Sequence, residues 1–344
     1  MTLYNIVNFS TRVNTCSDGF RLNHGQRILM LGSCFTEHIG QRLIQNKFQA
    51  VVNPFGVVYN PASIFEQLRC AMSELESPCS AQDGSRLFRN DGIWNSWLHD
   101  SSFSNFDEAE FVSRIRKSYA DCADAIRSVD VLFITMGTAR AYILKETGQL
   151  VSNCHKQPAS MFDEVQLSVE DIVNTGADVI QHILQFRPQA KIVFTVSPYR
   201  YAKYGFHGNQ ISKAILLLAV DGLINRFPNN AVYFPAYEIV NDELRDYRYY
   251  SDDLLHPSNL AVEYIWERFA EDWVAPESKQ FMLEWGKILC DLNHRPFSPN
   301  SSQYKAFLSR TYEKINRIQS KLSPISFASE LDEISQRLNN IQTS

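Results

Sequence analysis

Short runs of apolar residues alternate along the chain with longer stretches in which apolar residues recur every three or four positions. The short runs predict strands and the longer stretches predict helices, an alternation typical of a parallel sheet covered by helices on both faces. The predicted strands are 27–31, 50–52, 129–136, 191–196 and 231–234. The predicted helices are 36–46, 169–186, 210–226 and 260–273. We therefore expect a flavodoxin-like, three-layer α/β/α fold with about five strands.

An insertion, about residues 61–127, separates the second predicted strand from the third. It begins with a predicted helix at 61–73, followed by a polar stretch at 74–84. A β-hairpin turning at Asp91-Gly92 is predicted within 86–102, because apolar and aromatic residues flank this dipeptide. Its tryptophans, Trp94 and Trp97, indicate either a small local core or a wall of a substrate site.

The pattern changes again after residue 275. Amphipathic helices are predicted at 304–322 and 327–341, after a break at 293–302 that contains two prolines. We expect an α/β domain over residues 1–275 and a C-terminal helical extension over residues 276–344. The amphipathic faces of the extension suggest packing on the main domain or formation of a homodimer.

Composition and charge narrow the class of protein. There are 33 Lys and Arg against 38 Asp and Glu, a net charge of -5, which lacks the basic excess needed to bind a nucleic acid backbone. No run of about 20 apolar residues predicts a membrane span, and the first residues do not resemble a signal peptide. The seven cysteines contain no CxxC pair, which favours a reducing compartment. We expect a cytoplasmic protein without a nucleic acid or membrane partner.

The first candidate for chemistry is Gly32-Ser33-Cys34-Phe35, between the first predicted strand and the first predicted helix. Open α/β sheets place ligand-binding residues at such turns. N–H groups that begin a helix can stabilise an oxyanion. Ser33 is thus a candidate nucleophile, although helix capping is the commoner role of a serine at this position. Cys34 is an alternative nucleophile if its side chain turns toward a base.

The second candidate is Asp253-Leu254-Leu255-His256, which lies between the last predicted strand and the last helix of the domain. A spacing of three allows the Asp253 carboxylate to hold Nδ1 of His256 and leave Nε2 free to accept a proton. Such a pair alone is more often a surface contact. Because a doubly wound sheet brings both loops to one edge, Ser33, His256 and Asp253 together predict a nucleophile, a base and its orienting partner.

These motifs resemble those of a known family. Gly32-Ser33-Cys34-Phe35 resembles the signature of the GSCFA family, a relative of the SGNH or GDSL-type hydrolases, with Thr36 in place of the alanine. Further similar blocks follow in the same order: Asn53-Pro54-Phe55-Gly56, Tyr59-Asn60-Pro61, Met136-Gly137-Thr138, Asn153-Cys154-His155-Lys156, Val196-Ser197-Pro198 and Asp253-Leu254-Leu255-His256. The resemblance spans most of the chain.

The resemblance implies a role for each matching residue. Ser33 would be the nucleophile, His256 the general base and Asp253 its partner, while the N–H groups of Ser33 and Gly56 would form the oxyanion hole. The SGNH pattern has a further donor, an asparagine, where this chain has Ala139.

Other residues can replace the missing donor or contact the substrate. The hydroxyl of Thr138 can donate to the oxyanion, and Asn153 or His155 can reach in from the next loop. Arg200 is a candidate for binding an anionic or sugar-like group, and Trp94 for lining the substrate site. No metal or organic cofactor is needed for this chemistry.

The resemblance implies a serine esterase or acyl hydrolase that removes a small acyl group, such as acetyl, from a carbohydrate-like or other ester. Two alternatives remain open at this point. A non-catalytic carbohydrate-binding or scaffold protein is favoured by the missing asparagine and by the tryptophans of the hairpin. An O-acyltransferase would result if the insertion excluded water.

Overall fold

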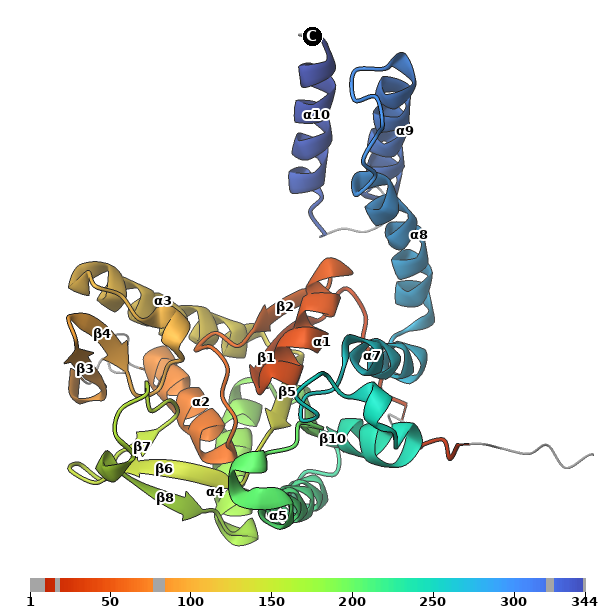
Figure 1. The fold of residues 1–344 in the computed structure, drawn as a ribbon. Coiled ribbons are helices and arrows are strands. Elements are labelled where there is room, and N and C mark those ends of the chain that lie inside the picture. The colour runs from red at the N-terminus through yellow and green to blue at the C-terminus, as the bar shows by residue number, and fades with distance from the viewer. Residues whose placement is uncertain (1–9, 16–18, 77–83, 320–324, 343–344) are drawn as a thin grey trace, which may run out of the picture.

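Five parallel strands form the central sheet of the computed structural model, which describes residues 10–15, 19–76, 84–319 and 325–342 (Figure 1). The strands are β1 (Arg27–Gly32), β2 (Gln49–Val52), β5 (Val131–Met136), β9 (Lys191–Val196) and β10 (Ala231–Tyr233). Their order across the sheet is β10-β9-β5-β1-β2. Every residue of β5 is buried, because this strand is central and both faces of the sheet are covered. The predicted α/β class and the five-stranded parallel sheet are confirmed.

Helices pack on both faces of this sheet, and successive residues of β1 point to opposite cores. Leu29 and Leu31 belong to one apolar core and Ile28 and Met30 to the other. The helices that contribute to the first core are α2 (Pro61–Glu76), α3 (Glu108–Ser128), α4 (Val169–Phe186) and α5 (Gly205–Arg226). Those that contribute to the second are α1 (Cys34–Gln45), the short α6 (Ala236–Glu238) and α7 (Asn259–Trp273).

The insertion differs in part from its prediction. The hairpin of β3 (Leu87–Asn90) and β4 (Ile93–Ser96) forms as expected, and Asp91 and Gly92 both have positive φ, as a tight hairpin turn requires. Helix α3, which returns the chain to β5, was not predicted. A second, antiparallel sheet was also missed, formed by β6 (Arg140–Leu144), β7 (Leu150–Val151) and β8 (Phe162–Gln166). Part of the predicted polar stretch, 77–83, lies outside the described residues.

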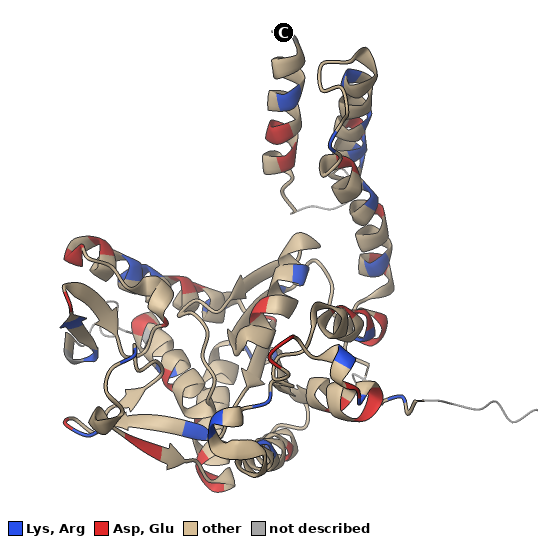
Figure 2. Cartoon of the chain, viewed as in Figure 1, with Lys and Arg blue, Asp and Glu red and all other residues tan. Residues whose placement is uncertain are grey.

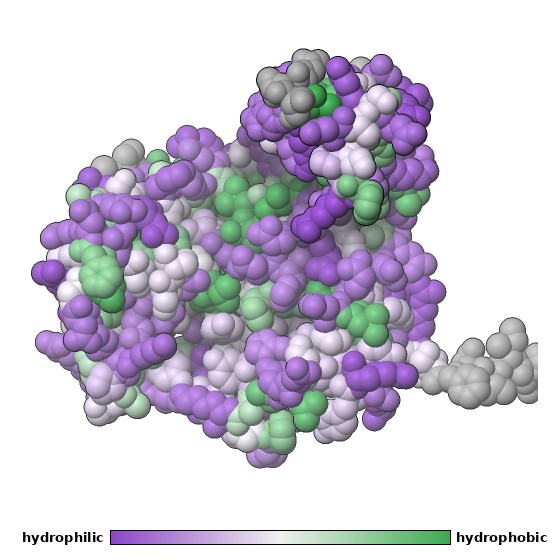
Figure 3. Space-filling view, turned by 45° about the horizontal axis from the view of Figure 1, so that its top comes forward, coloured by the Kyte–Doolittle hydropathy of each residue, from purple (hydrophilic) through white to green (hydrophobic). Residues whose placement is uncertain are grey.

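The C-terminal helices project from the α/β body (Figure 1). They are α8 (Pro276–Leu292), α9 (Ser302–Gln319) and α10 (Ala328–Gln342). The predicted break at 293–302 is confirmed, whereas residues 320–322 of the helix predicted at 304–322 lie outside the described residues. These helices share an apolar core of their own, which includes Trp285 and Phe327. Figure 3 shows apolar residues gathered in the hollow between this helical unit and the body.

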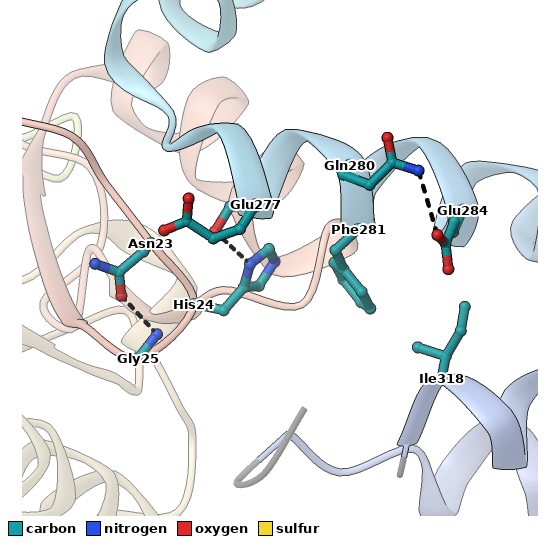
Figure 4. A pocket seen from close by; sticks show the side chains of 9 residues that line it. Asn23, His24, Gly25, Glu277, Gln280, Phe281, Glu284 and Ile318 are labelled. Carbon is teal, nitrogen blue, oxygen red and sulfur yellow. Dashed lines mark hydrogen bonds between the residues drawn. The ribbon is translucent and has the colours of Figure 1, made fainter. Parts of the chain in front are cut away.

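Hydrogen bonds of His24 in the body and of Trp285 on α8 join the helical unit to the body near the end of α1. His24 lies 4.0 Å from the ring of Phe48; its Nδ1 hydrogen bonds Oγ of Ser278 on α8, and its Nε2 donates to the Asn46 carbonyl. Nε1 of Trp285 donates to the Gln45 carbonyl at 2.8 Å. Beside His24 lies a cavity of about 340 Å³, with Glu277, Phe281 and Glu284 of α8 on its wall (Figure 4). This cavity lies at the opposite end of α1 from the turn that follows β1.

The surface carries both signs of charge. Acidic and basic side chains are interspersed over the body and over the helical unit (Figure 2). None of the described helices combines the length and the apolar character that crossing a bilayer requires.

Candidate active site

The turn between β1 and α1 is forced by Gly32. Its φ is +147°, and a Cβ at this position would lie 2.3 Å from the carbonyl oxygen of Thr135 on β5. Only glycine fits such a backbone and such a close approach. Ser33, the next residue, occupies the N-cap position of α1, but its side chain makes no capping hydrogen bond. The main chain therefore turns sharply at the carboxyl end of β1 and places Ser33 and Cys34 at the start of α1.

The Ser33 hydroxyl, predicted to be the nucleophile, is buried. The residue is 1% exposed, and its Oγ has no hydrogen bond partner among the described residues. A Cβ placed on Gly137 would lie 3.6 Å from Cβ of Ser33, so the side chain lies against the end of β5. Its N–H makes only a long bond of 3.4 Å to the Thr135 carbonyl.

Cys34 is the first residue of α1 and is half-buried. Burial raises the pKa of its thiol, while the N–H groups of Phe35 and Cys34 and the ammonium of Lys213 act in the opposite direction. These N–H groups lie at the positive end of the helix dipole, which favours a thiolate.

Lys213 is a buried residue that the sequence analysis missed. It is 1% exposed, and its Nζ donates to the carbonyls of Gly137 and Ser197, both at 2.6 Å. Burial lowers the pKa of Lys213 to about 7. The sequence carried one signal of this burial, because Lys213 directly precedes an apolar run of α5. A charged side chain in such a buried position needs hydrogen bond partners.

Asp253 and His256 form the predicted pair. Oδ2 of Asp253 lies 2.5 Å from Nδ1 of His256, and Oδ1 accepts from the N–H groups of Leu255 and His256 at 2.9 and 3.0 Å. These hydrogen bonds, with that from the imidazole first, lower the pKa of Asp253 to about 2. The carboxylate thus holds the Nδ1 proton, and Nε2 is left free to act as a base.

The loop of this pair docks on the chain that follows β9. The ring of Tyr199 lies 4.2 Å from the ring of His256. The backbone N–H of Arg200 donates to the Leu255 carbonyl at 3.1 Å, and its Nη1 donates to the Leu254 carbonyl at 3.2 Å. The guanidinium also lies 4.4 Å from the ring of Phe206. Arg200, predicted to bind the substrate, therefore braces the loop that carries His256.

The same loop lies close to α1. The pKa of His38 is lowered by burial, by Arg42 and also by the charge of His256. Cys34 and His38 stand four residues apart and so share one face of α1. Arg42 of α1 is paired with Glu263 of α7 at 2.6 Å, and α7 follows the His256 loop directly. The turn after β1 and the Asp253–His256 pair thus lie at one edge of the sheet.

The predicted oxyanion donor Gly56 has another partner. Its N–H donates to the carbonyl of Asn53 at 2.8 Å and closes a turn. Asn53, which the sequence analysis did not single out as a donor, accepts from the Gly32 N–H with its Oδ1 at 2.9 Å. Its Nδ2 is buried without a partner among the described residues. An amide donor is therefore held at the β1–α1 turn by the residue that precedes Ser33.

The other predicted donors line a cavity next to this turn. Thr138 shares a hydrogen bond of 3.1 Å with Ser212, and Oδ1 of Asn153 accepts from the N–H of His155. The cavity has a volume of about 400 Å³. Its tyrosines and amides are Tyr59, Tyr142, Tyr201, Tyr204, Asn60, Asn153 and Gln157. Tyr201 contacts both Tyr59 and Tyr199, so a row of rings leads from His256 to the cavity.

His155 and Trp94 have structural contacts instead of positions on this cavity. Nε2 of His155 hydrogen bonds the carbonyl of Ser96, which ties its loop to the hairpin. Trp94 stacks along Phe111 of α3 and belongs to the packing of the main core. Of the two roles considered for the tryptophans, Trp94 thus has the structural one.

Across the described ranges, His, Cys, Asp and Glu side chains form no group of three or more that could hold a metal ion.

Comparison with known proteins places the chain in a family. The model of the GSCFA family matches residues 27–269, which include every element of the candidate site. The chain belongs to the GSCFA family. A second model, of the C-terminal domain of GSCFA domain proteins, matches residues 285–340, within α8 to α10. No curated protein matches the chain. The resemblance seen in the motifs is confirmed for GSCFA, and the reaction has to be argued from the site.

Proposed function

We propose that this GSCFA protein hydrolyses ester bonds by nucleophilic acyl transfer, and that its body is related to the SGNH hydrolases. The observation that carries the proposal is the Asp253–His256 pair, which lies at the same sheet edge as the turn after β1. Taken in chain order, the strands of the sheet are arranged 2-1-3-4-5, the order of flavodoxin-like folds, which supports the relation to the superfamily.

Each group has a defined part in such a reaction. Asp253 holds His256 in the tautomer whose Nε2 accepts the proton of the nucleophile. The nucleophile, at the turn after β1, attacks the ester carbonyl, and the N–H groups that begin α1 stabilise the oxyanion. His256 then protonates the leaving alcohol and afterwards activates water for deacylation. Ser33, the nucleophile expected from the sequence, can attack only if the turn opens, because its Oγ is buried.

The adjoining cavity supports a small ester of a carbohydrate-like alcohol as the substrate. Its volume of about 400 Å³ falls in the range of small-molecule sites. Tyrosine rings offer flat apolar faces, and their hydroxyls, with the amides beside them, offer donors and acceptors for hydroxyl groups.

Turnover of p-nitrophenyl acetate and of an acetylated sugar tests the proposal. His256→Ala should lower turnover by about 10³-fold or more, because it removes the general base. His294→Ala is the matched control, because this histidine is exposed at the end of α8 and far from the site. Equal turnover in both variants would contradict an enzymatic role of the pair. Sugar binding without turnover in the unaltered chain would instead support a non-catalytic module.

A further inference from the structure

Two adjacent side chains at the β1–α1 turn differ in their access to a substrate. Ser33 is 1% exposed, and the accessible area of its Oγ is practically nil. Cys34 is half-buried and begins the helix. A nucleophilic atom has to approach the carbonyl carbon of the substrate to about 3 Å. It must therefore be accessible from the substrate site.

The surroundings of Cys34 point toward the base. Burial raises the pKa of Tyr199, and the negative charges of Asp253 and Cys34 raise it further, because both groups lie near its hydroxyl. The Tyr199 ring also touches His256. His38 shares a face of α1 with Cys34. Its pKa is lowered chiefly by burial and also by the nearby His256. Cys34 and His256 thus have two neighbours in common, Tyr199 after β9 and His38 on α1.

We propose that Sγ of Cys34, and not Oγ of Ser33, is the nucleophile of this site, in a triad with His256 and Asp253. The proposal rests on the proposed function and changes its chemistry from an oxyester to a thioester intermediate. Ser33 then occupies the N-cap position of α1 without a capping hydrogen bond from its side chain.

The ester and one water molecule are the only reactants that these steps consume. Nε2 of His256 takes the thiol proton while Sγ forms a bond to the acyl carbon. As the C–O bond to the alcohol breaks, the same proton passes from Nε2 to the leaving oxygen. Water then gives a proton to His256 and attacks the thioester, the C–S bond breaks, and the thiol regains its proton.

Two further groups fit an acyl-cysteine intermediate at this turn. Nδ2 of Asn53 is an amide donor without a partner; the residue is 9% exposed, and its Oδ1 is fixed by the Gly32 N–H. It can donate to the oxyanion, a role for which Gly56 has no free N–H. The charge of the buried Lys213 also favours negative charge on the sulfur, and acts against the burial that raises the pKa of the Cys34 thiol.

The test compares Cys34→Ala, Cys34→Ser and Ser33→Ala in the full chain. Turnover of p-nitrophenyl acetate should fall by about 10³-fold or more in both Cys34 variants. Ser33→Ala should keep turnover within about ten-fold, because Oγ makes no hydrogen bond that the change would remove. An acid-quenched reaction should hold one acetyl group on residue 34, and neutral hydroxylamine should release it, as it does thioesters.

A second measurement does not depend on turnover. Iodoacetamide should alkylate Cys34 at least several-fold more slowly in His256→Ala than in the unaltered chain, because only the thiolate reacts. Cys290→Ala is the matched control, since Cys290 is exposed in the helical unit and its loss should leave this rate unchanged.

The outcomes separate the two proposals. Loss of turnover in Ser33→Ala together with full turnover in Cys34→Ala would overturn the assignment of Cys34 and leave an esterase. If no ester is turned over faster than by His256→Ala, the proposed function fails. Cys34 is then still supported as a base-activated thiol if its alkylation depends on His256, and is rejected if it does not.

Discussion

Gly32→Ala is the substitution whose effect follows most directly from the geometry of the turn. A methyl group there would lie 2.3 Å from the Thr135 carbonyl and 2.8 Å from Oγ1 of Thr36, at a φ of +147°. The backbone strain contributes about 1–3 kcal/mol. Forcing the methyl group into occupied space adds about 1–3 kcal/mol. We expect the free energy of unfolding to fall by roughly 2–6 kcal/mol, a large part of the about 5–15 kcal/mol typical of a domain.

Gly148→Ala is the matched control, because Gly148 also has a positive φ, +71°, but its Cβ would meet nothing within 4 Å. Only the backbone strain applies there, so the two variants should differ by the clash, about 1–3 kcal/mol. Urea unfolding followed by far-UV circular dichroism measures both. With a slope of about 2 kcal/mol per M, the midpoint of Gly32→Ala should lie on the order of 1 M below that of the control. Equal midpoints would refute the close approach at the β1–α1 turn.

Three more predictions follow from the site and the insertion. Asp253→Asn should lower turnover by about 10⁴-fold, because an amide no longer holds His256 in the tautomer whose Nε2 accepts a proton. An unchanged circular dichroism spectrum would show that the variant is folded. Arg200→Ala should lower turnover by about ten-fold or more, because it removes the hydrogen bond to the Leu254 carbonyl that positions the His256 loop. The melting temperature should stay nearly constant. The pKa of buried His99 is lowered to about 3 from 6.5, so the unfolded chain binds protons more readily. The contribution of neutral His99 to the free energy of unfolding, present above pH 6.5, should therefore be lost as the pH falls toward 3, by at most about 1.4 kcal/mol per pH unit. In His99→Leu, urea unfolding at a series of pH values should show a weaker dependence of this free energy on pH.

The parallel sheet could be predicted because its strands are buried on both faces. Strand β9 and helix α4 have the predicted bounds, since an uninterrupted apolar run and a regular helical period mark them clearly. The small antiparallel sheet was missed because β6 and β8 are short and partly exposed, which leaves only a weak alternation. Helix α3 could have been predicted, because Asp107 caps it and its buried positions, from Phe111 to Ile126, recur every three or four residues.

The pairing at the site could be predicted in part. Asp253 and His256 meet because they are close in sequence, and the sheet topology brings their loop to β1. The burial of the Ser33 hydroxyl depends on how closely β5 approaches the turn, and no local pattern reports that distance. The second partner of the Gly56 N–H could not be read from residue types either, because it is a main-chain carbonyl.

The residues that join the body to the helical unit should differ in how freely they can be substituted. One hydrogen bond across this joint runs from Nε1 of Trp285 to the main-chain carbonyl of Gln45, an acceptor that every residue type supplies. Another joins two side chains, Nδ1 of His24 and Oγ of Ser278, so it depends on the residue type at both ends. A substitution at position 45 should thus leave this attachment intact, whereas replacing His24 or Trp285 should weaken it, so a survey of natural variants should find more variation at position 45 than at positions 24 and 285.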